Sequence, residues 1–186
     1  MHHGENSSKP HAVPTDRIIQ EQDIITIDMG CKIDGYCSDM TRTIFVGGIT
    51  EEQKKVYELV LENQKRVLNE TMEGANIKTL ARSVETNFNI FNYTLIHGLG
   101  HGVGLDIHEL PAINMKNDTL LKENMVITDE PGIYIPGNFG IRIEDTVLVT
   151  KKGAISLTES DKECIIIWVF MYQFSHHYKW QTLCIR

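Results

Sequence analysis

The chain has 186 residues, a formal net charge of −7, a hydrophobic content of 41% and a charged content of 23%. These values are typical of one soluble globular domain, and the acidic balance without a Lys/Arg cluster argues against nucleic-acid binding. The longest apolar run, residues 165–172, is shorter than the ~20 residues that cross a membrane, so no membrane partner is expected.

Residues 24–46 are predicted to form a β-hairpin. The run I-I-T-I-D ends at Asp28, a D-G pair supplies turn chemistry, and an apolar strand returns after Asp39. A hairpin that folds at residues 33–34 places Asp28 opposite Asp39, with Cβ atoms ~5 Å apart on one face. Acids are disfavoured in apolar strands, and two carboxylates this close repel unless a cation lies between them. We therefore interpret both as candidate metal ligands rather than turn-flanking acids.

Two helices are predicted next. Residues 50–73 begin with a T-x-x-Q capping box and carry an apolar stripe of helical period, and Gly74 is a candidate stop. Residues 77–90 carry a second stripe of this kind. A short strand is expected at residues 93–96, ahead of a glycine-rich segment.

That segment reads H-G-L-G-H-G-V-G and contains His97 and His101, with His108 further along. It does not match the dinucleotide fingerprint G-x-G-x-x-G, because Val103 occupies the third glycine position. One such histidine is usually structural, but three beside several glycines favour a metal centre that the backbone passes closely. The interval between His101 and His108 fits neither the H-E-x-x-H of zinc proteases nor a zinc finger.

A second hairpin is predicted over residues 125–150, with a P-G-N turn around Gly137. Glu130 and Glu144 lie symmetrically about Gly137, so they too are expected to meet across the strands. Both interrupt apolar strand sequence, as the two aspartates do.

The candidate ligands are therefore four carboxylates and one imidazole: Asp28, Asp39, His101, Glu130 and Glu144. Structural zinc prefers Cys and His, whereas this hard donor set suits two neighbouring divalent cations bridged by carboxylates. Such a centre generates hydroxide at neutral pH, which predicts a dinuclear metallohydrolase.

The motifs G-Y-C-S-D-M-T-R-T, H-G-L-G-H-G-V-G-L-D-I-H-E, E-P-G-I-Y and G-I-R-I-E-D-T resemble the pita-bread metallopeptidases. Within this family of methionine aminopeptidase, aminopeptidase P and prolidase, they are similar to the proline-peptidase branch, over about residues 9–160. The resemblance implies an α+β pita-bread (creatinase/aminopeptidase-like) fold: a curved antiparallel sheet flanked by helices, here with an incomplete first half. It also implies a partial catalytic domain at 1–164 and a divergent C-terminal tail at 165–186.

By this resemblance, Asp28 chelates one metal, His101 and Glu130 the other, and Asp39 and Glu144 bridge them. Glu130 would also shuttle the proton of the attacking hydroxide.

The resemblance further implies that His11 and His108 hold the substrate and polarise the scissile carbonyl, which makes them catalytic and substrate-binding candidates. His97 joins this set as a lining residue of the pocket. Arg142 would brace the bridging carboxylates from behind.

The implied activity is hydrolysis of Xaa-Pro peptide bonds by a metal-bound hydroxide, of aminopeptidase P or prolidase type. The expected cofactor is a pair of divalent ions, Mn²⁺ first, with Co²⁺ or Zn²⁺ as alternatives. The expected partner is a peptide with proline at its second position, and a homodimer stays open. The cysteines form no C-x-x-C pair and are interpreted as free thiols of a reducing, cytoplasmic compartment: Cys31, Cys37, Cys164 and Cys184.

Two alternatives to this enzyme remain. The same fold also serves as a non-catalytic peptide- or protein-binding module, so the chain is alternatively such a module or an inactive fragment. The other is a metal-free hydrolase of the creatinase type. The presence of all five ligand positions favours the metallopeptidase.

Overall fold

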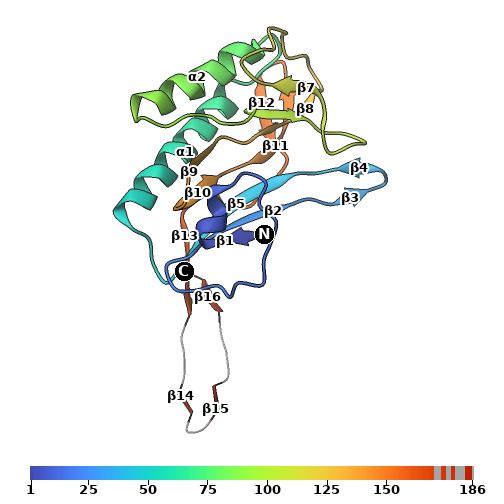
Figure 1. Cartoon of the computed structure of the whole chain (residues 1–186). Helices are drawn as coiled ribbons and strands as arrows, with labels where there is room; N and C mark the ends of the chain where they lie inside the picture. The colour runs from blue at the N-terminus through green and yellow to red at the C-terminus, as the bar shows by residue number, and fades with distance from the viewer. Residues whose placement is uncertain (170–172, 175–176, 179–182, 186) are drawn as a thin grey trace.

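The computed structural model describes residues 1–169, 173–174, 177–178 and 183–185, and comprises two long helices beside several β-sheets (Figure 1). The helices are α1 (Glu51–Glu70) and α2 (Ile77–Ile90), and a short 3₁₀ helix, η1 (Gly4–Ser8), lies near the N-terminus.

Two five-stranded sheets form the main framework. The first has the spatial order β1 (His2–His3), β2 (Ile24–Met29), β5 (Met40–Val46), β13 (Ile165–Val169) and β16 (Leu183–Ile185). The second has the order β12 (Gly153–Ser156), β11 (Asp145–Thr150), β8 (Val126–Asp129), β6 (Gly100–Gly102) and β7 (Glu109–Ile113). Three two-stranded ladders complete the described strands: β3 (Lys32–Ile33) with β4 (Tyr36–Cys37), β9 (Gly132–Ile135) with β10 (Phe139–Arg142), and β14 (Gln173–Phe174) with β15 (His177–Tyr178).

The first predicted hairpin is confirmed, but its predicted register is wrong. Asp28 pairs with Thr41 rather than with Asp39. The turn lies at Asp34 and Gly35, both with positive φ, so the chain reverses one residue later than expected. Asp39 therefore lies before β5, diagonal to Asp28 in the continued register. Residues two positions apart on a strand share a face, so the offset keeps the two acids on one side.

The second predicted hairpin has the expected register. β8 pairs with β11, and β9 pairs with β10, in two ladders that are both centred on Gly137. Asp129 lies opposite Asp145, and the ladders are interrupted at the next positions, Glu130 and Glu144. The two acids thus face each other where the hydrogen-bonded ladder opens.

Both helices form where they are predicted. Thr50 and Gln53 make the capping box at the start of α1, with side chain and backbone bonded in both directions. α1 ends at Glu70, slightly before the predicted boundary, because Thr71 is extended. Gly74 adopts a positive φ in the connection to α2.

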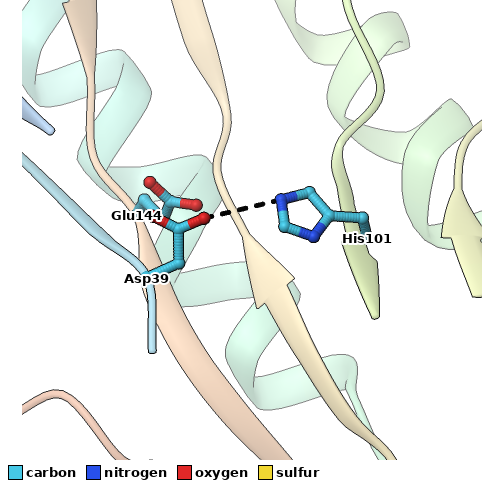
Figure 2. A group of neighbouring side chains, drawn as sticks. All are labelled: Asp39, His101 and Glu144. Atoms are coloured by element: carbon cyan, nitrogen blue, oxygen red, sulfur yellow. Dashed lines mark ion pairs between the residues drawn. The ribbon is translucent and has the colours of Figure 1, made fainter. Parts of the chain in front are cut away.

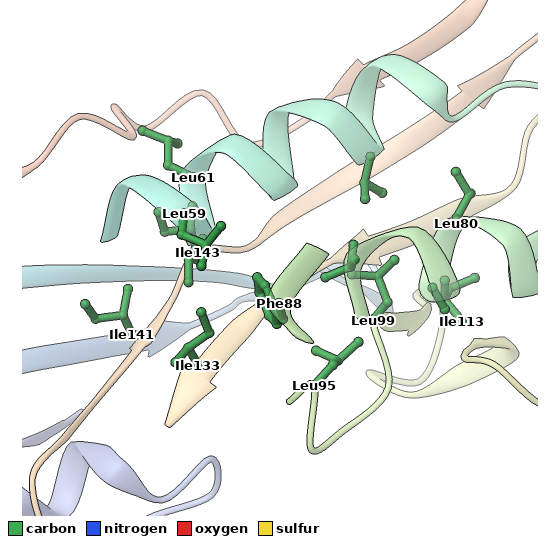
Figure 3. Close-up of a cluster of buried hydrophobic side chains, with 14 of the residues drawn as sticks. Leu59, Leu61, Leu80, Phe88, Leu95, Leu99, Ile113, Ile133, Ile141 and Ile143 are labelled. Carbon is green, nitrogen blue, oxygen red and sulfur yellow. The ribbon is translucent and has the colours of Figure 1, made fainter. Parts of the chain in front are cut away.

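The main hydrophobic core lies between the helices and the strands, where α1 packs against β8, β9, β10 and β12 (Figures 1 and 3). Phe88, Ile141 and Ile143 are fully buried within it. This core supports the backs of the strands whose ends carry the acids. None of the helices in the described residues has the length and apolar character of a membrane span.

A second, smaller core cluster joins β13 to the first sheet. Ile167 is buried with Ile25, Ile44 and Val46, and β13 runs parallel to β5. The isoleucines that follow residue 164 therefore form a strand. The domain boundary between residues 164 and 165 stays a prediction.

The prediction of a strand at residues 93–96 is wrong, because these residues form no strand. The Tyr93 N–H donates to Phe88 O (3.0 Å) and the Leu95 N–H to a Glu85 carboxylate oxygen (2.7 Å). These bonds to α2 occupy the donors that a strand ladder would need. The actual strand is β6, inside the glycine-rich segment.

The structure explains the glycines of β6 by packing against neighbouring strands, whereas the sequence analysis explained them by a nearby metal centre. A Cβ on Gly100 would lie 2.1 Å from Thr128 O, and one on Gly102 would lie 2.4 Å from Leu110 O. Glycine is required because β6 approaches the backbone of its neighbours too closely for any side chain. This close approach brings His101, which lies between them, toward the acids.

Candidate metal centre

Three of the predicted ligands converge. Asp39, His101 and Glu144 each offer one ligand atom, and these atoms lie within 4.8 Å of one another (Figure 2). They come from the residue before β5, from β6 and from the junction of β10 and β11. His101 Nε2 lies 3.7 Å from Asp39 Oδ2. Segments far apart in the sequence thus form one cluster.

A cavity of about 410 Å³ surrounds this cluster and is also lined by the other two predicted ligands, Asp28 and Glu130. His101 Nε2 is 3.4 Å from Glu130 Oε1. The Thr128 hydroxyl accepts a hydrogen bond from the His101 backbone N–H (3.0 Å) and donates to Glu130 Oε1 (3.2 Å), which links the Glu130 side chain to the backbone of β6. All five predicted ligands therefore face one cavity.

The tautomer of His101 follows from its other nitrogen. Nδ1 lies 3.0 Å from Gly102 O, so Nδ1–H is the donor and Nε2 keeps its lone pair. That lone pair faces the Asp39 and Glu130 carboxylates, the orientation that a metal-binding imidazole needs.

Two threonines tie the two hairpins together at the ligands. The Thr41 hydroxyl donates to Glu144 Oε2 (2.5 Å), and the Glu144 N–H donates to Thr41 O (3.1 Å). The Thr146 hydroxyl accepts from the Asp39 N–H (3.1 Å) and donates to Asp39 O (2.7 Å). Each hairpin thereby holds an acid of the other.

Arg142 is the central cation of the cavity. It is 3% exposed. Its guanidinium donates to Asp28 Oδ2 (2.5 Å), to the Thr41 hydroxyl (3.1 Å), to the Tyr134 hydroxyl (3.0 Å) and to Pro10 O (3.0 Å). It therefore contacts Asp28 directly and is linked to Glu144 through Thr41. The role implied by the family resemblance, a brace for both Asp39 and Glu144, stays a prediction.

The three predicted substrate histidines all line the cavity, in different states. His97 is held by Gly98 O at Nδ1 (2.7 Å) and by the Tyr134 hydroxyl at Nε2 (3.0 Å), and burial lowers its pKa to about 4. His108 is exposed and its ring meets that of His101 edge-on, with centroids 4.3 Å apart. His11 is exposed and follows Pro10, whose carbonyl accepts a hydrogen bond from Arg142.

The electrostatics of the cavity favour added positive charge. Burial raises the pKa of Asp39, Glu130 and Glu144, and the Glu130 and Asp39 carboxylates raise that of Glu144 further. Arg142 balances only part of this negative charge. Carboxylate oxygens and one imidazole nitrogen are donors that divalent cations accept, so the residues fit a metal centre.

Thr41 and Tyr134 are site residues that the sequence reasoning missed. Each lies inside a motif that carries the family resemblance, D-M-T-R-T and E-P-G-I-Y. Their place in these motifs was the available signal, but neither is a ligand type for this centre.

Comparisons with known proteins show which family the chain resembles. A model of metallopeptidase family M24 matches residues 1–151. The Xaa-Pro dipeptidase of Pyrococcus furiosus is 48% identical over 165 residues, which cover 87% of this chain and 47% of that protein. A putative Xaa-Pro aminopeptidase of Mycoplasma genitalium is 43% identical over 163 residues, covering 84% and 46%. The chain spans about half the length of the curated relatives it matches.

Solved structures give the same result. The prolidase from Pyrococcus furiosus superposes with a TM-score of 0.83 at 47% identity, covering 86% of this chain and 48% of that one. The X-Pro aminopeptidase from Thermotoga maritima gives a TM-score of 0.85 at 38% identity, covering 88% and 47%. These likenesses confirm the predicted α+β pita-bread fold, present here in part.

Proposed function

The chain belongs to metallopeptidase family M24, and on that premise we propose that its cavity is a dinuclear metal site for hydrolysis of Xaa-Pro peptide bonds. The observation that carries this proposal is the convergence of Asp39, His101 and Glu144 within 4.8 Å in a cavity also lined by Asp28 and Glu130. The names of the relatives, Xaa-Pro dipeptidase and X-Pro aminopeptidase, support the substrate class.

The proposed ligand arrangement is the one that the family resemblance implies. Asp39 and Glu144 would be shared by two cations, His101 and Glu130 would help hold one of them, and Asp28 would help hold the other. The short distances from His101 to Asp39 and Glu130 support the first site, and the orienting bond from Arg142 supports Asp28. The proposed metal is Mn²⁺, with Co²⁺ and Zn²⁺ as alternatives. When bound, the two cations supply an activated water and polarise the scissile carbonyl.

Glu130 then has a second role in the proposal. Its carboxylate, oriented by the Thr128 hydroxyl, takes the proton of the attacking water and returns it to the departing proline nitrogen. A group that both accepts and donates must lie beside the reacting atoms, and Glu130 lines the cavity next to His101.

The histidines divide the remaining work. His108 and His11 are exposed at the cavity, so their rings are free to hold the peptide and stabilise the developing oxyanion. His97 has both nitrogens engaged, so it shapes the cavity wall and holds Tyr134.

The test combines metal binding with a paired peptide assay. Calorimetric titration of the purified chain should give two Mn²⁺ per chain, and Mn²⁺ should raise the melting temperature by mass action while a chelator lowers it. The metal-loaded chain should cleave an Xaa-Pro peptide and leave an Xaa-Ala control intact.

Three results would overturn parts of this proposal separately. One tetrahedral zinc at saturation would remove the dinuclear site. Equal cleavage of both peptides would keep the metallohydrolase and remove the proline specificity. Two bound cations without cleavage of either peptide would show that this chain alone is a binding module or an inactive fragment.

A further inference from the structure

Arg42 lies behind the proposed metal site, on β5, and holds the backbone at a proposed ligand. It is 5% exposed, and its Nη1 donates to two carbonyls, Thr41 O at 2.9 Å and Glu144 O at 2.6 Å. Thr41 and Glu144 also bond to each other directly, through the Thr41 hydroxyl and the Glu144 N–H. One buried cation therefore fixes both strands where Glu144 leaves the ladder.

Asp145, the residue after Glu144, anchors that cation. It is fully buried and accepts from four donors: Arg42 Nη2 (2.8 Å), Lys162 Nζ (2.5 Å), Gln64 Nε2 (3.0 Å) and the Thr158 hydroxyl (2.7 Å). Four donors use the acceptor capacity of a carboxylate. Asp145 is thereby held from α1, from β5 and from the segment after β12.

That segment closes the arrangement from outside. Arg42 Nε donates to Asp161 O (3.0 Å), its Nη2 donates to Ser160 O (2.8 Å), and the Tyr57 hydroxyl of α1 donates to Lys162 O (3.0 Å). We call Arg42, Asp145 and Lys162 the rear clamp. It touches none of the cavity-lining ligand atoms and acts on the backbone that carries them.

We propose that the rear clamp is a positioning device that sets the place of the Glu144 carboxylate and thereby the affinity of the site for divalent cations. The proposal rests on the proposed function. Burying the charges of Arg42 and Asp145 costs desolvation free energy, and apolar replacements of such groups are often as stable. Because the clamp binds the backbone of Glu144 itself, we expect its main contribution to be the position of this ligand rather than stability. Residues that orient metal ligands affect metal affinity by about 10–100-fold.

The main variants are Asp145→Asn and Arg42→Lys. Lysine keeps the charge but lacks the planar guanidinium group that donates five hydrogen bonds here. Arg42→Lys should therefore keep the Mn²⁺ affinity of the unaltered chain only if charge alone matters. The matched control is Asp23→Asn: Asp23 is also buried and doubly bonded to Arg17 (2.6 and 3.0 Å), but it precedes β2, at the opposite end from the ligand Asp28.

Calorimetric Mn²⁺ titration should show dissociation constants about 10–100-fold higher in both main variants, and unchanged constants in Asp23→Asn. Lys162→Met removes one donor at the partly exposed edge of the clamp and should weaken binding in the same direction by less. This variant decides the question if the other two do not fold. Unchanged affinity in a folded clamp variant, or equal weakening in Asp23→Asn, would overturn the proposal.

A metal-free readout separates the clamp from the function it rests on. The Glu144 amide, which donates to Thr41 O, should exchange with solvent about tenfold faster in the clamp variants than in the unaltered chain and the Asp23→Asn control. Equal exchange rates would refute the positioning role. If the unaltered chain binds no divalent cation, the proposed function fails, and the exchange rates still decide whether the clamp positions Glu144.

Discussion

The two hairpins that carry the acids differ most in the exposure of one acid each, Asp28 in the first and Glu144 in the second. In the first hairpin the Asp28 side chain is 42% exposed and lies within a regular ladder, whereas the Asp39 side chain is 12% exposed and lies outside the ladder. In the second hairpin Glu130 and Glu144 face each other at a break in the ladder, and Glu144 is 2% exposed. We call the first hairpin, with its exposed Asp28, the open wall of the cavity, and the second hairpin, with its buried Glu144, the closed wall.

Each wall nevertheless depends on the other. Arg142 of the second hairpin balances Asp28 of the first, and Thr41 of the first hairpin holds Glu144 of the second. Exposed acids keep their solvation and lose little when unpaired, whereas buried acids depend on their partners. Changes in the closed wall should therefore cost more than matching changes in the open wall.

The largest effect is expected from removing the acid of Glu130. Glu130→Gln removes a proposed ligand and the proposed proton shuttle, so turnover should fall by about 10²–10⁴-fold and Mn²⁺ binding should weaken. Asp28→Asn, in the open wall, removes a ligand only, so its loss of turnover should be smaller. Steady-state kinetics on an Xaa-Pro peptide check both, and an equal loss in the two variants would contradict the contrast between the walls.

The histidines sharpen the same contrast. His108→Ala removes an exposed donor from the cavity and should lower kcat by about 10²–10³-fold, the usual effect of one oxyanion donor. Mn²⁺ binding should stay unchanged, because His108 is not a proposed ligand. His97→Gln changes a residue whose nitrogens are already engaged, so its loss should be smaller. A His97 variant that loses as much as the His108 variant would show that His97 contacts substrate.

The features that sequence predicts well here are those set by local chemistry. The capping box at Thr50 places α1, and symmetry about Gly137 gives the correct facing pair, because the turn and both ladders share one centre. In the first hairpin the same symmetry argument gives a register whose centre is wrong by one residue. Its turn uses two positive-φ residues, Asp34 and Gly35, which shifts the ladder relative to Asp39.

The features that sequence does not predict depend on distant contacts. β6 consists of Gly100, His101 and Gly102, residues without strand propensity, and exists because neighbouring backbones leave no room for side chains. Arg42 looks like an ordinary polar residue of the strand M-T-R-T-I-F-V, and its five acceptors come from residues about a hundred positions away as well as from its neighbour. No local pattern encodes such a partner set.

The threonine links between the walls should have an intermediate effect. Thr41→Val keeps the shape of the side chain and removes the hydrogen bonds to Glu144 and Arg142, so Mn²⁺ affinity should fall about tenfold. Thr146→Val removes bonds to the Asp39 backbone only and should cost less, because the Asp39 carboxylate itself loses no hydrogen bond. Calorimetric titration of the two variants checks the order, and a greater loss in Thr146→Val would reverse it.

The smallest effect should come from the two turns. Gly35 and Gly137 both have positive φ, and a Cβ on either meets no atom closer than 3.8 Å, so alanine adds backbone strain without a clash. Each substitution should destabilise the fold by about 1 kcal/mol, measured by urea denaturation. Their effects on Mn²⁺ affinity should differ. Gly137→Ala strains the turn that sets Glu130 against Glu144, whereas Asp39 is fixed by Thr146 whatever the Gly35 turn does. If Gly35→Ala weakened Mn²⁺ binding as much as Gly137→Ala, the placement of Asp39 would depend on its own turn, and the open wall would be built in the same way as the closed one.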